Sequence, residues 1–273
     1  MITLYGMPRS RALRVAWVLE ELGAEWAFSF VDMNKGEHRS AAFLTLNPCG
    51  KVPVLTDDNL VLSESAAICL YLAEKFGKLL PEAGSAASGL HHQWVSFIIT
   101  ELEQPLWTLG KHKFALPEAQ RHPSIMPCAV WEFDKAALAE AMLPDSDFLL
   151  GDTLSVADIL LAHTLMWGTL FEQQIPPKLA AYRDRIAARP SRKSALAKMD
   201  AVAAAAQQGA QPGLQLVEVE GLGQVVVGTG VQAQHAVAHG AARGQDEHGR
   251  AQALAARTLQ HLQAVQAGQA QVQ

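Results

Sequence analysis

The sequence predicts two domains, an α/β domain followed by an all-helical domain. The chain has 273 residues, of which 49% are hydrophobic, so it can bury more than one core. Short apolar runs alternate with helical patterns over residues 1–81, which is typical of a sheet covered by helices. Residues 90–208 have helical periods and no strand pattern, and the Ala-, Ser- and Gly-rich residues 82–89 are the expected linker.

Four elements are expected before residue 47. Residues 2–5 and 26–31 are predicted strands, and residues 40–46 a short helix. Between the two strands, residues 12–22 form a predicted helix that ends at Gly23. Apolar residues almost encircle this helix, so we expect it to be packed on both sides.

A hairpin and a third helix complete the first domain. Residues 52–55 and 59–62 are two apolar strands around an Asp-Asp-Asn turn. Pro53 opens the first strand, and a cis bond before it would turn the backbone of Val52 outward, where an extended peptide could pair. The helix after Ser63-Glu64-Ser65 offers free N–H groups to an anion. This order matches a thioredoxin-like domain, a mixed sheet with helices on both faces.

The second domain is expected to contain two long helices, residues 90–111 and 118–143, and three shorter ones after Ser155, Pro177 and Pro190. Ser155 and Asp158 have the spacing of a capping box, so we assign Asp158 a structural role.

The last segment differs in composition from the rest of the chain. Residues 209–273 lack Phe, Tyr, Trp, Ile, Met, Cys, Lys, Asn and Ser, while Gln, Gly, Ala, Val and His dominate. A low-complexity segment with so little to bury is expected to be disordered or loosely helical, and its composition suggests frame-shifted readthrough of a GC-rich gene.

Charge and cysteine usage exclude several classes of protein. The net charge of −5 argues against a nucleic-acid partner. Cys49, Cys69 and Cys128 have neither metal-ligand nor redox-pair spacing, which indicates a reducing compartment and no metal site. Because no signal peptide or membrane-spanning pattern is evident, we expect a cytoplasmic protein that does not contact a membrane.

Separated motifs resemble one known family. Gly-Lys-Val-Pro-Val-Leu at residues 50–55 and Ser-Glu-Ser-Ala-Ala-Ile at residues 63–68 are similar to the glutathione-binding half of the glutathione S-transferases. Tyr-Gly-Met-Pro-Arg-Ser-Arg-Ala-Leu-Arg-Val at residues 5–15 resembles the theta-like and bacterial members of serine type, and the resemblance extends over about residues 1–206. It implies a cytoplasmic homodimer that conjugates the thiolate of glutathione, its co-substrate, to small hydrophobic electrophiles in detoxification.

Ser10 is the predicted catalytic residue. A thiol has a pKa near 8.5, so bound glutathione stays largely protonated at neutral pH unless the protein stabilises the thiolate. At a helix start, the Ser10 hydroxyl, the helix dipole and the charges of Arg9 and Arg11 can converge on one sulfur. The alternative is that Ser10 only caps its helix.

The resemblance also implies the glutathione-binding residues. Ser65 would hold the γ-glutamyl carboxylate and Glu64 the ammonium group, although a plain helix cap would explain both residues. His38 and Lys51 match positions that contact the glycyl carboxylate, and for each a solvated loop charge is the alternative. The full expected set is His38, Lys51, Val52, Pro53, Glu64 and Ser65.

The electrophile is expected between the loop before the first helix and the first long helix of the second domain. Aromatic residues at helical spacing are more often core residues, which is the alternative here. Arg14 matches a family arginine, for which we favour a structural role. The expected pocket residues are Met7, Arg9, Arg11, Leu106, Trp107 and Lys111.

Two other functions are compatible with the fold. A non-catalytic glutathione-transferase-like binding or regulatory protein would keep the fold without the chemistry. A glutathione-dependent thiol reductase is disfavoured, because Met7-Pro8-Arg9-Ser10 stands where a thioredoxin-fold oxidoreductase has Cys-Pro-x-Cys.

Overall fold

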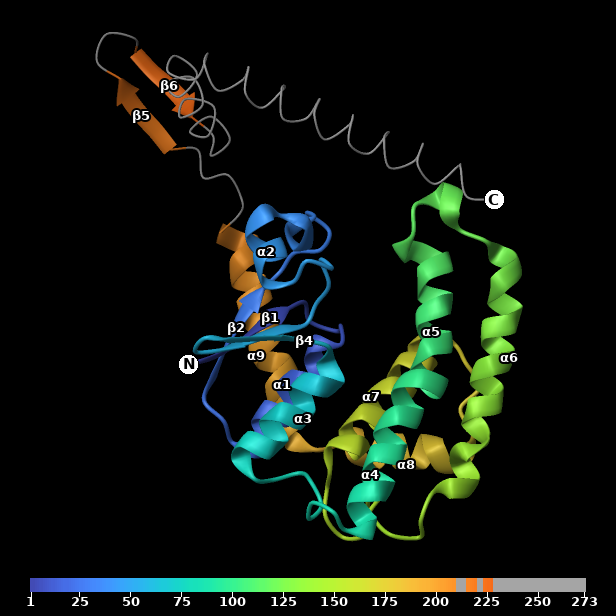
Figure 1. The fold of residues 1–273 in the computed structure, drawn as a ribbon. Coiled ribbons are helices and arrows are strands. Elements are labelled where there is room, and N and C mark those ends of the chain that lie inside the picture. Colours follow the sequence, from blue (N-terminus) through green and yellow to red (C-terminus); the bar gives the residue numbers. More distant parts are fainter. Residues whose placement is uncertain (210–214, 220–222, 228–273) are drawn as a thin grey trace, which may run out of the picture. The chain divides into compact units, whose positions relative to one another are not determined.

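The computed structural model describes residues 1–209, 215–219 and 223–227. The chain divides into two units, Met1–Ala206 and Gln207–Gln273. The first unit contains one four-stranded mixed sheet in the order β2-β1-β3-β4 (Figure 1). β1 pairs in parallel with β2 and antiparallel with β3, which pairs antiparallel with β4. The predicted thioredoxin-like arrangement is therefore confirmed. Its strands are β1 (Ile2–Gly6), β2 (Trp26–Phe30), β3 (Val54–Asp57) and β4 (Leu60–Ser63).

Helices cover both faces of this sheet. α1 (Ala12–Leu22) and α3 (Ser65–Phe76) lie on one face and α2 (Ala41–Leu46) on the other (Figure 1). α1 is buried along most of its length, as its nearly continuous apolar sequence predicts. It ends where predicted, at Gly23, whose φ of 68° is left-handed and suits glycine.

The hairpin is confirmed, with its strands shifted along the sequence. β3 begins at Val54, after Pro53, because proline has no N–H to donate to the ladder. The Val52–Pro53 bond is cis, as expected.

The second part of the unit is mainly helical. α4 (Ala86–Phe97) and α5 (Glu103–Gly110) continue one another through a π-helical segment, Ile98–Leu102, and a second one, Lys111–Ala115, follows α5. α4 starts inside the segment expected to be a linker. The other helices are α6 (Met126–Ala137), α7 (Val156–Leu170), α8 (Pro177–Ala187) and α9 (Pro190–Gly209).

The prediction of one helix over residues 118–143 is wrong at both ends. α6 begins only at Met126, because Pro123 and Pro127 cannot lie inside a helix and are tolerated only in a first turn. After Ala137 the chain tightens into a 3₁₀ segment, Leu138–Met142.

α7 is the centre of the helical core, and its start is anchored by Asp158. The predicted capping box of Ser155 and Asp158 is present. The Asp158 carboxylate is fully buried and also accepts hydrogen bonds from the Leu149 N–H and the Tyr182 hydroxyl. These contacts confirm its structural role.

The second unit contains an antiparallel hairpin of β5 (Gln215–Val219) and β6 (Gly223–Val227). The sequence analysis expected no strands there. The rest of the segment predicted to be disordered lies outside the described residues. Among the helices that the structure describes, none is long and apolar enough to cross a membrane.

Candidate functional site

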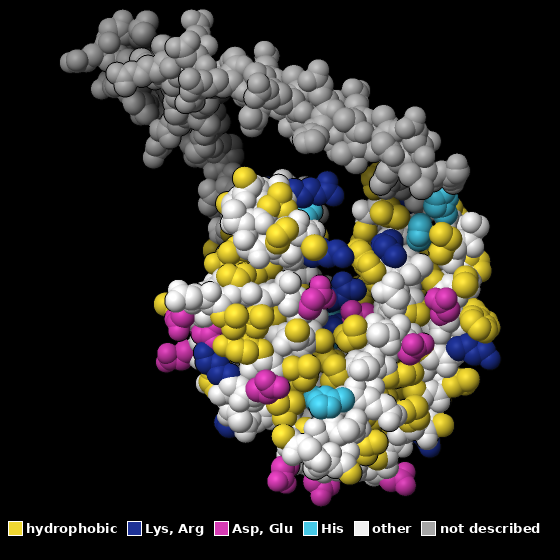
Figure 2. Space-filling model, viewed as in Figure 1, with side chains coloured by type: hydrophobic (Ala, Val, Ile, Leu, Met, Phe, Trp, Pro, Cys, Tyr) yellow, Lys and Arg dark blue, Asp and Glu magenta, His cyan; other side chains and the backbone are white. Residues whose placement is uncertain are grey.

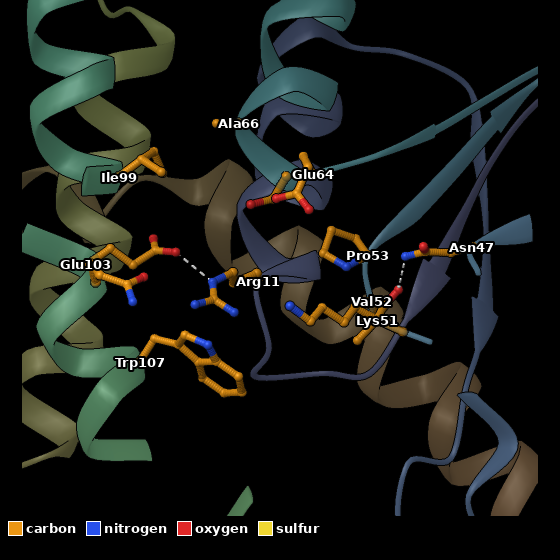
Figure 3. A pocket seen from close by; sticks show the side chains of 12 residues that line it. Arg11, Asn47, Lys51, Val52, Pro53, Glu64, Ala66, Ile99, Glu103 and Trp107 are labelled. Atoms are coloured by element: carbon orange, nitrogen blue, oxygen red, sulfur yellow. Dashed lines mark hydrogen bonds and ion pairs between the residues drawn. The ribbon is translucent and has the colours of Figure 1, made fainter. Parts of the chain in front are cut away.

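A cavity of about 250 Å³ opens between the loop before β3, the start of α3 and the side of α5. Figure 2 shows a hollow on this face, with Lys and Arg side chains gathered along it. Side chains from both halves of the unit point toward one another in the cavity (Figure 3). It is lined by Arg11, Asn47, Lys51, Val52, Pro53, Glu64, Ser65, Ala66, Ile99, Glu103, Gln104 and Trp107.

The loop before β3 supplies a backbone wall, and Asn47 holds this loop in place. The buried Asn47 side chain donates to the Lys51 carbonyl at 2.8 Å and accepts from the Cys49 N–H at 3.0 Å. These bonds fix the loop that carries Lys51 and Val52 into the cavity wall (Figure 3). Asparagine side chains often bond to the backbone of the turn that follows them. The position of Asn47 before this loop was therefore a signal in the sequence, and sequence reasoning missed it.

The start of α3 forms the adjoining wall. Glu64 has a φ of 68°, which is unusual outside glycine and has to be held by the surrounding structure. Its side chain extends into the cavity (Figure 3). Ser65 is the first residue of α3, so free N–H groups at this end can receive an anion.

Behind this wall lies a buried charge network that joins α1, α5 and α7. Arg14 is fully buried and donates to Glu103 Oε2 at 2.5 Å, and its Nη1 lies 3.5 Å from the Ser65 hydroxyl. Glu103 also accepts from the Thr164 hydroxyl at 3.3 Å. Burial alone would raise the pKa of the Glu103 carboxyl, but the charges of Arg14 and Arg11 outweigh it and hold the pKa at about 2.

His163 completes the network in its neutral form. Its Nδ1 lies 3.0 Å from Arg14 Nη2 and its Nε2 3.3 Å from the Ser10 carbonyl oxygen. Burial, assisted by the positive charge of Arg14, lowers the pKa of His163 to about 3. A neutral imidazole that accepts from Arg14 and donates to Ser10 satisfies both contacts.

Arg11 faces the cavity between two aromatic rings. Its Nε donates to Glu103 Oε1 at 2.6 Å. Its guanidinium carbon lies 5.2 Å from the ring centre of Trp107 and 4.7 Å from that of Trp167, within cation–π range. The side chain is therefore held from three sides (Figure 3 shows Glu103 and Trp107).

Ser10 lies outside the cavity lining, with both functions of its hydroxyl engaged. The hydroxyl donates to the Met7 carbonyl at 2.7 Å and accepts from the Ala12 N–H at 3.1 Å. The second bond satisfies one of the free N–H groups at the start of α1, which is the helix-capping alternative.

The remaining predicted residues lie away from the cavity lining. Arg9 is exposed and forms a two-point ion pair with Asp200 at 2.8 and 2.9 Å. Burial and the nearby Arg39 charge lower the pKa of His38. The expectation for Leu106 is corrected, because its side chain has no exposed surface and belongs to the hydrophobic core. Met7 and Lys111 are half-buried and do not line the cavity.

The cysteines show no cluster suited to a metal. No group of three or more His, Cys, Asp or Glu side chains that could hold an ion occurs in the part of the chain that the structure describes. Cys49 and Cys128 are exposed and Cys69 is buried, which raises the pKa of the Cys69 thiol to about 12.

Sequence reasoning expected Trp107 of α5 in the pocket, and Trp107 lines the cavity, but the contribution of Glu103 on the same helix was missed. Glu103 could have indicated a buried ion pair, because a carboxylate on an apolar helix face needs a partner. The partners could not be identified, since Arg11 and Arg14 lie about ninety residues earlier. The cavity residues not predicted are Asn47, Ala66, Ile99, Glu103 and Gln104.

Comparison with known proteins identifies two family models. Residues 1–74 match the N-terminal domain of glutathione S-transferase, and residues 121–190 match its C-terminal domain. The chain is 34% identical to glutathione S-transferase theta-1 of Bos taurus over 58% of this chain and 70% of that protein. It is 33% identical to glutathione S-transferase 3 of Zea mays over 70% of this chain and 90% of that protein.

A solved structure agrees with these matches. The crystal structure of a glutathione transferase from Methylococcus capsulatus superposes with a TM-score of 0.65 and 28% identity, over 74% of this chain and 100% of that chain.

Proposed function

The chain belongs to the glutathione S-transferase family and is a glutathione transferase, and on this basis we propose that it conjugates glutathione to small hydrophobic electrophiles. The observation that carries this proposal is one cavity that joins the Val52 backbone, the start of α3 and a fixed cation, Arg11. Residues 1–81 supply the glutathione wall and residues 90–208 the electrophile wall.

Glutathione is a tripeptide with two carboxylates, one ammonium group and one thiol, and the cavity offers partners for both carboxylates and for the ammonium group. Val52 pairs with its backbone, Pro53 shapes that edge, and Lys51 attracts the glycyl carboxylate. Ser65 receives the γ-glutamyl carboxylate, with Arg14 behind it, and Glu64 takes the ammonium group. His38 lies outside the lining, so we assign it at most an indirect role.

The thiol lies toward the start of α1, where the conjugation step occurs. The bound thiol loses its proton to solvent, and the thiolate attacks the electrophilic carbon and displaces the leaving group. Ser10 can serve as a hydrogen-bond donor to the sulfur by turning its hydroxyl away from the Met7 carbonyl. Trp107 and Ile99 offer apolar surface for the electrophile. The proposed setting is a cytoplasmic homodimer engaged in detoxification.

The first experiment is capture on immobilised glutathione, followed by a conjugation assay with an aryl halide. We expect retention on the resin, glutathione-dependent turnover and an ultraviolet thiolate band from the complex near neutral pH. Retention without turnover against a panel of electrophiles, and without the thiolate band, would support the non-catalytic binding protein instead.

A further inference from the structure

Two polar groups at the start of α1 can approach a glutathione sulfur, and they differ in what they have free to donate. The Ser10 hydroxyl has a single proton, which it donates to the Met7 carbonyl at 2.7 Å. Arg11 uses only Nε, bonded to Glu103, and among the described residues its two terminal nitrogens have no hydrogen-bond partner. Arg11 also lines the cavity, and Ser10 does not.

Arg11 is preorganised for this role. Its Nε is bonded to Glu103 at 2.6 Å, and the rings of Trp107 and Trp167 lie 5.2 and 4.7 Å from its guanidinium carbon. Arginine normally loses much rotational freedom when it binds a ligand, but here the surrounding side chains have already restricted it. A charge held in place before the reaction stabilises a developing anion with little reorganisation.

The ionised groups around Arg11 leave a net positive charge at this place. Arg11 and Arg14 share one carboxylate, Glu103, while His163 is neutral at physiological pH because burial lowers its pKa to about 3. Two guanidinium groups and one carboxylate leave one net positive charge. Since Arg14 has no exposed surface and Arg11 retains 29% of its side-chain exposure, this charge reaches the cavity through Arg11.

We propose that Arg11, rather than Ser10, is the principal group that stabilises the glutathione thiolate. The inference rests on the proposed function, because it requires glutathione in this cavity. The thiol proton leaves to solvent, Arg11 stays protonated, and its terminal N–H groups donate to the sulfur anion. Glu103, Trp107 and Trp167 are positioning residues that act through Arg11.

The test is a pH titration of the thiolate band of bound glutathione in the full-length wild type, Arg11→Gln and Ser10→Ala. Arg11→Gln should raise the pKa of the bound thiol by at least about one unit, which corresponds to a loss of about 1.4 kcal/mol. Turnover at neutral pH should fall at least about tenfold and recover in part at high pH. Ser10→Ala should raise the pKa by less than about half a unit.

Two controls separate the charge at this site from other effects. Lys193→Gln removes one positive charge from an exposed position on α9 and should leave the thiol pKa unchanged. S-methylglutathione cannot ionise at sulfur, so its affinity for Arg11→Gln should stay within about threefold of wild type, which also reports an intact cavity.

The proposal is overturned if Ser10→Ala raises the thiol pKa by a full unit or more, or if folded Arg11→Gln leaves it unchanged. The Ser10→Ala titration remains decisive if Arg11→Gln does not fold. If instead the proposed function is wrong, the wild type itself will bind neither glutathione nor S-methylglutathione.

Discussion

The two walls of the cavity are built in different ways. The wall from the thioredoxin-like half comes from a short stretch of chain, Lys51 to Pro53 and Glu64 to Ala66, and it offers backbone groups and a helix start. The wall from the helical half comes from α5 and the π-helical segment before it, and it carries the Glu103 carboxylate and the Trp107 indole, which hold Arg11. The first wall suits recognition of an invariant peptide, while the second suits activation of the thiol and contact with variable electrophiles.

This comparison predicts that Glu103 matters most for stability. Glu103→Gln would leave Arg14 buried without its carboxylate, which should lower the free energy of unfolding by about 3–5 kcal/mol. Urea unfolding followed by circular dichroism measures the change. Glu101→Gln, an exposed carboxylate in the preceding π-helical segment, is the matched control and should change stability by less than about 0.5 kcal/mol. Equal effects of the two variants would contradict the network.

On the other wall, the largest effect should be on affinity. Ser65→Ala removes one hydrogen bond to the γ-glutamyl carboxylate, and such bonds contribute about 1.5–3 kcal/mol. The free N–H groups of α3 remain, so we expect glutathione affinity to fall by about tenfold, toward the lower end of that range. Titration calorimetry can compare this variant with Ser63→Ala at the end of β4, which should bind as wild type. If the Ser65→Ala variant bound glutathione as tightly as wild type, the proposed contact of Ser65 with the γ-glutamyl carboxylate would be wrong.

The buried charge network behind the cavity should also make stability depend on pH through His163. The unfolded imidazole binds a proton below pH 6.5, whereas the buried one does so only near pH 3. The unfolded state therefore binds more protons in this window, and stability falls as pH drops, by about 1 kcal/mol between pH 6.5 and 5.5.

His163→Gln should flatten this slope, and urea unfolding at the two pH values measures it. Burial also lowers the pKa of His91, so some slope should persist in the variant. His92→Gln, at an exposed position on α4, should retain the full wild-type slope. If His163→Gln also retained the full slope, the imidazole would have to be accessible to protons in the folded state.

The smallest effect is expected from the end of the chain. All residues that line the cavity belong to the unit Met1–Ala206. Truncation after Gln208 should therefore leave glutathione affinity unchanged and shift Tm by no more than about 2 °C. Differential scanning calorimetry and glutathione titration of the two chains provide the measurement. A large loss of glutathione affinity or a large drop in Tm would mean that residues after Gln208 contribute to binding or to stability.

Sequence reasoning succeeded where local rules decide structure and failed where they compete. The limits of α1 were predicted because an apolar helix ends at Gly23, and the capping box of α7 because Ser155 and Asp158 are three residues apart. The start of α6 was misplaced because helical periodicity was given more weight than Pro127.

The sequence by itself determined the fold class, the family and the peptide-binding wall, because each is written in contiguous residues whose backbone preferences are local. Only the tertiary structure decided which side chains meet across the cavity. Arg11 directly precedes α1, Glu103 lies in α5 and Trp167 in α7, and the requirement that a buried charge have a partner does not say where in the chain that partner is. The packing of α1 against α7 and the ion pairs of Arg11 and Arg14 with Glu103 of α5 answer that question, and they show a fixed arginine beside a serine whose hydroxyl is already engaged.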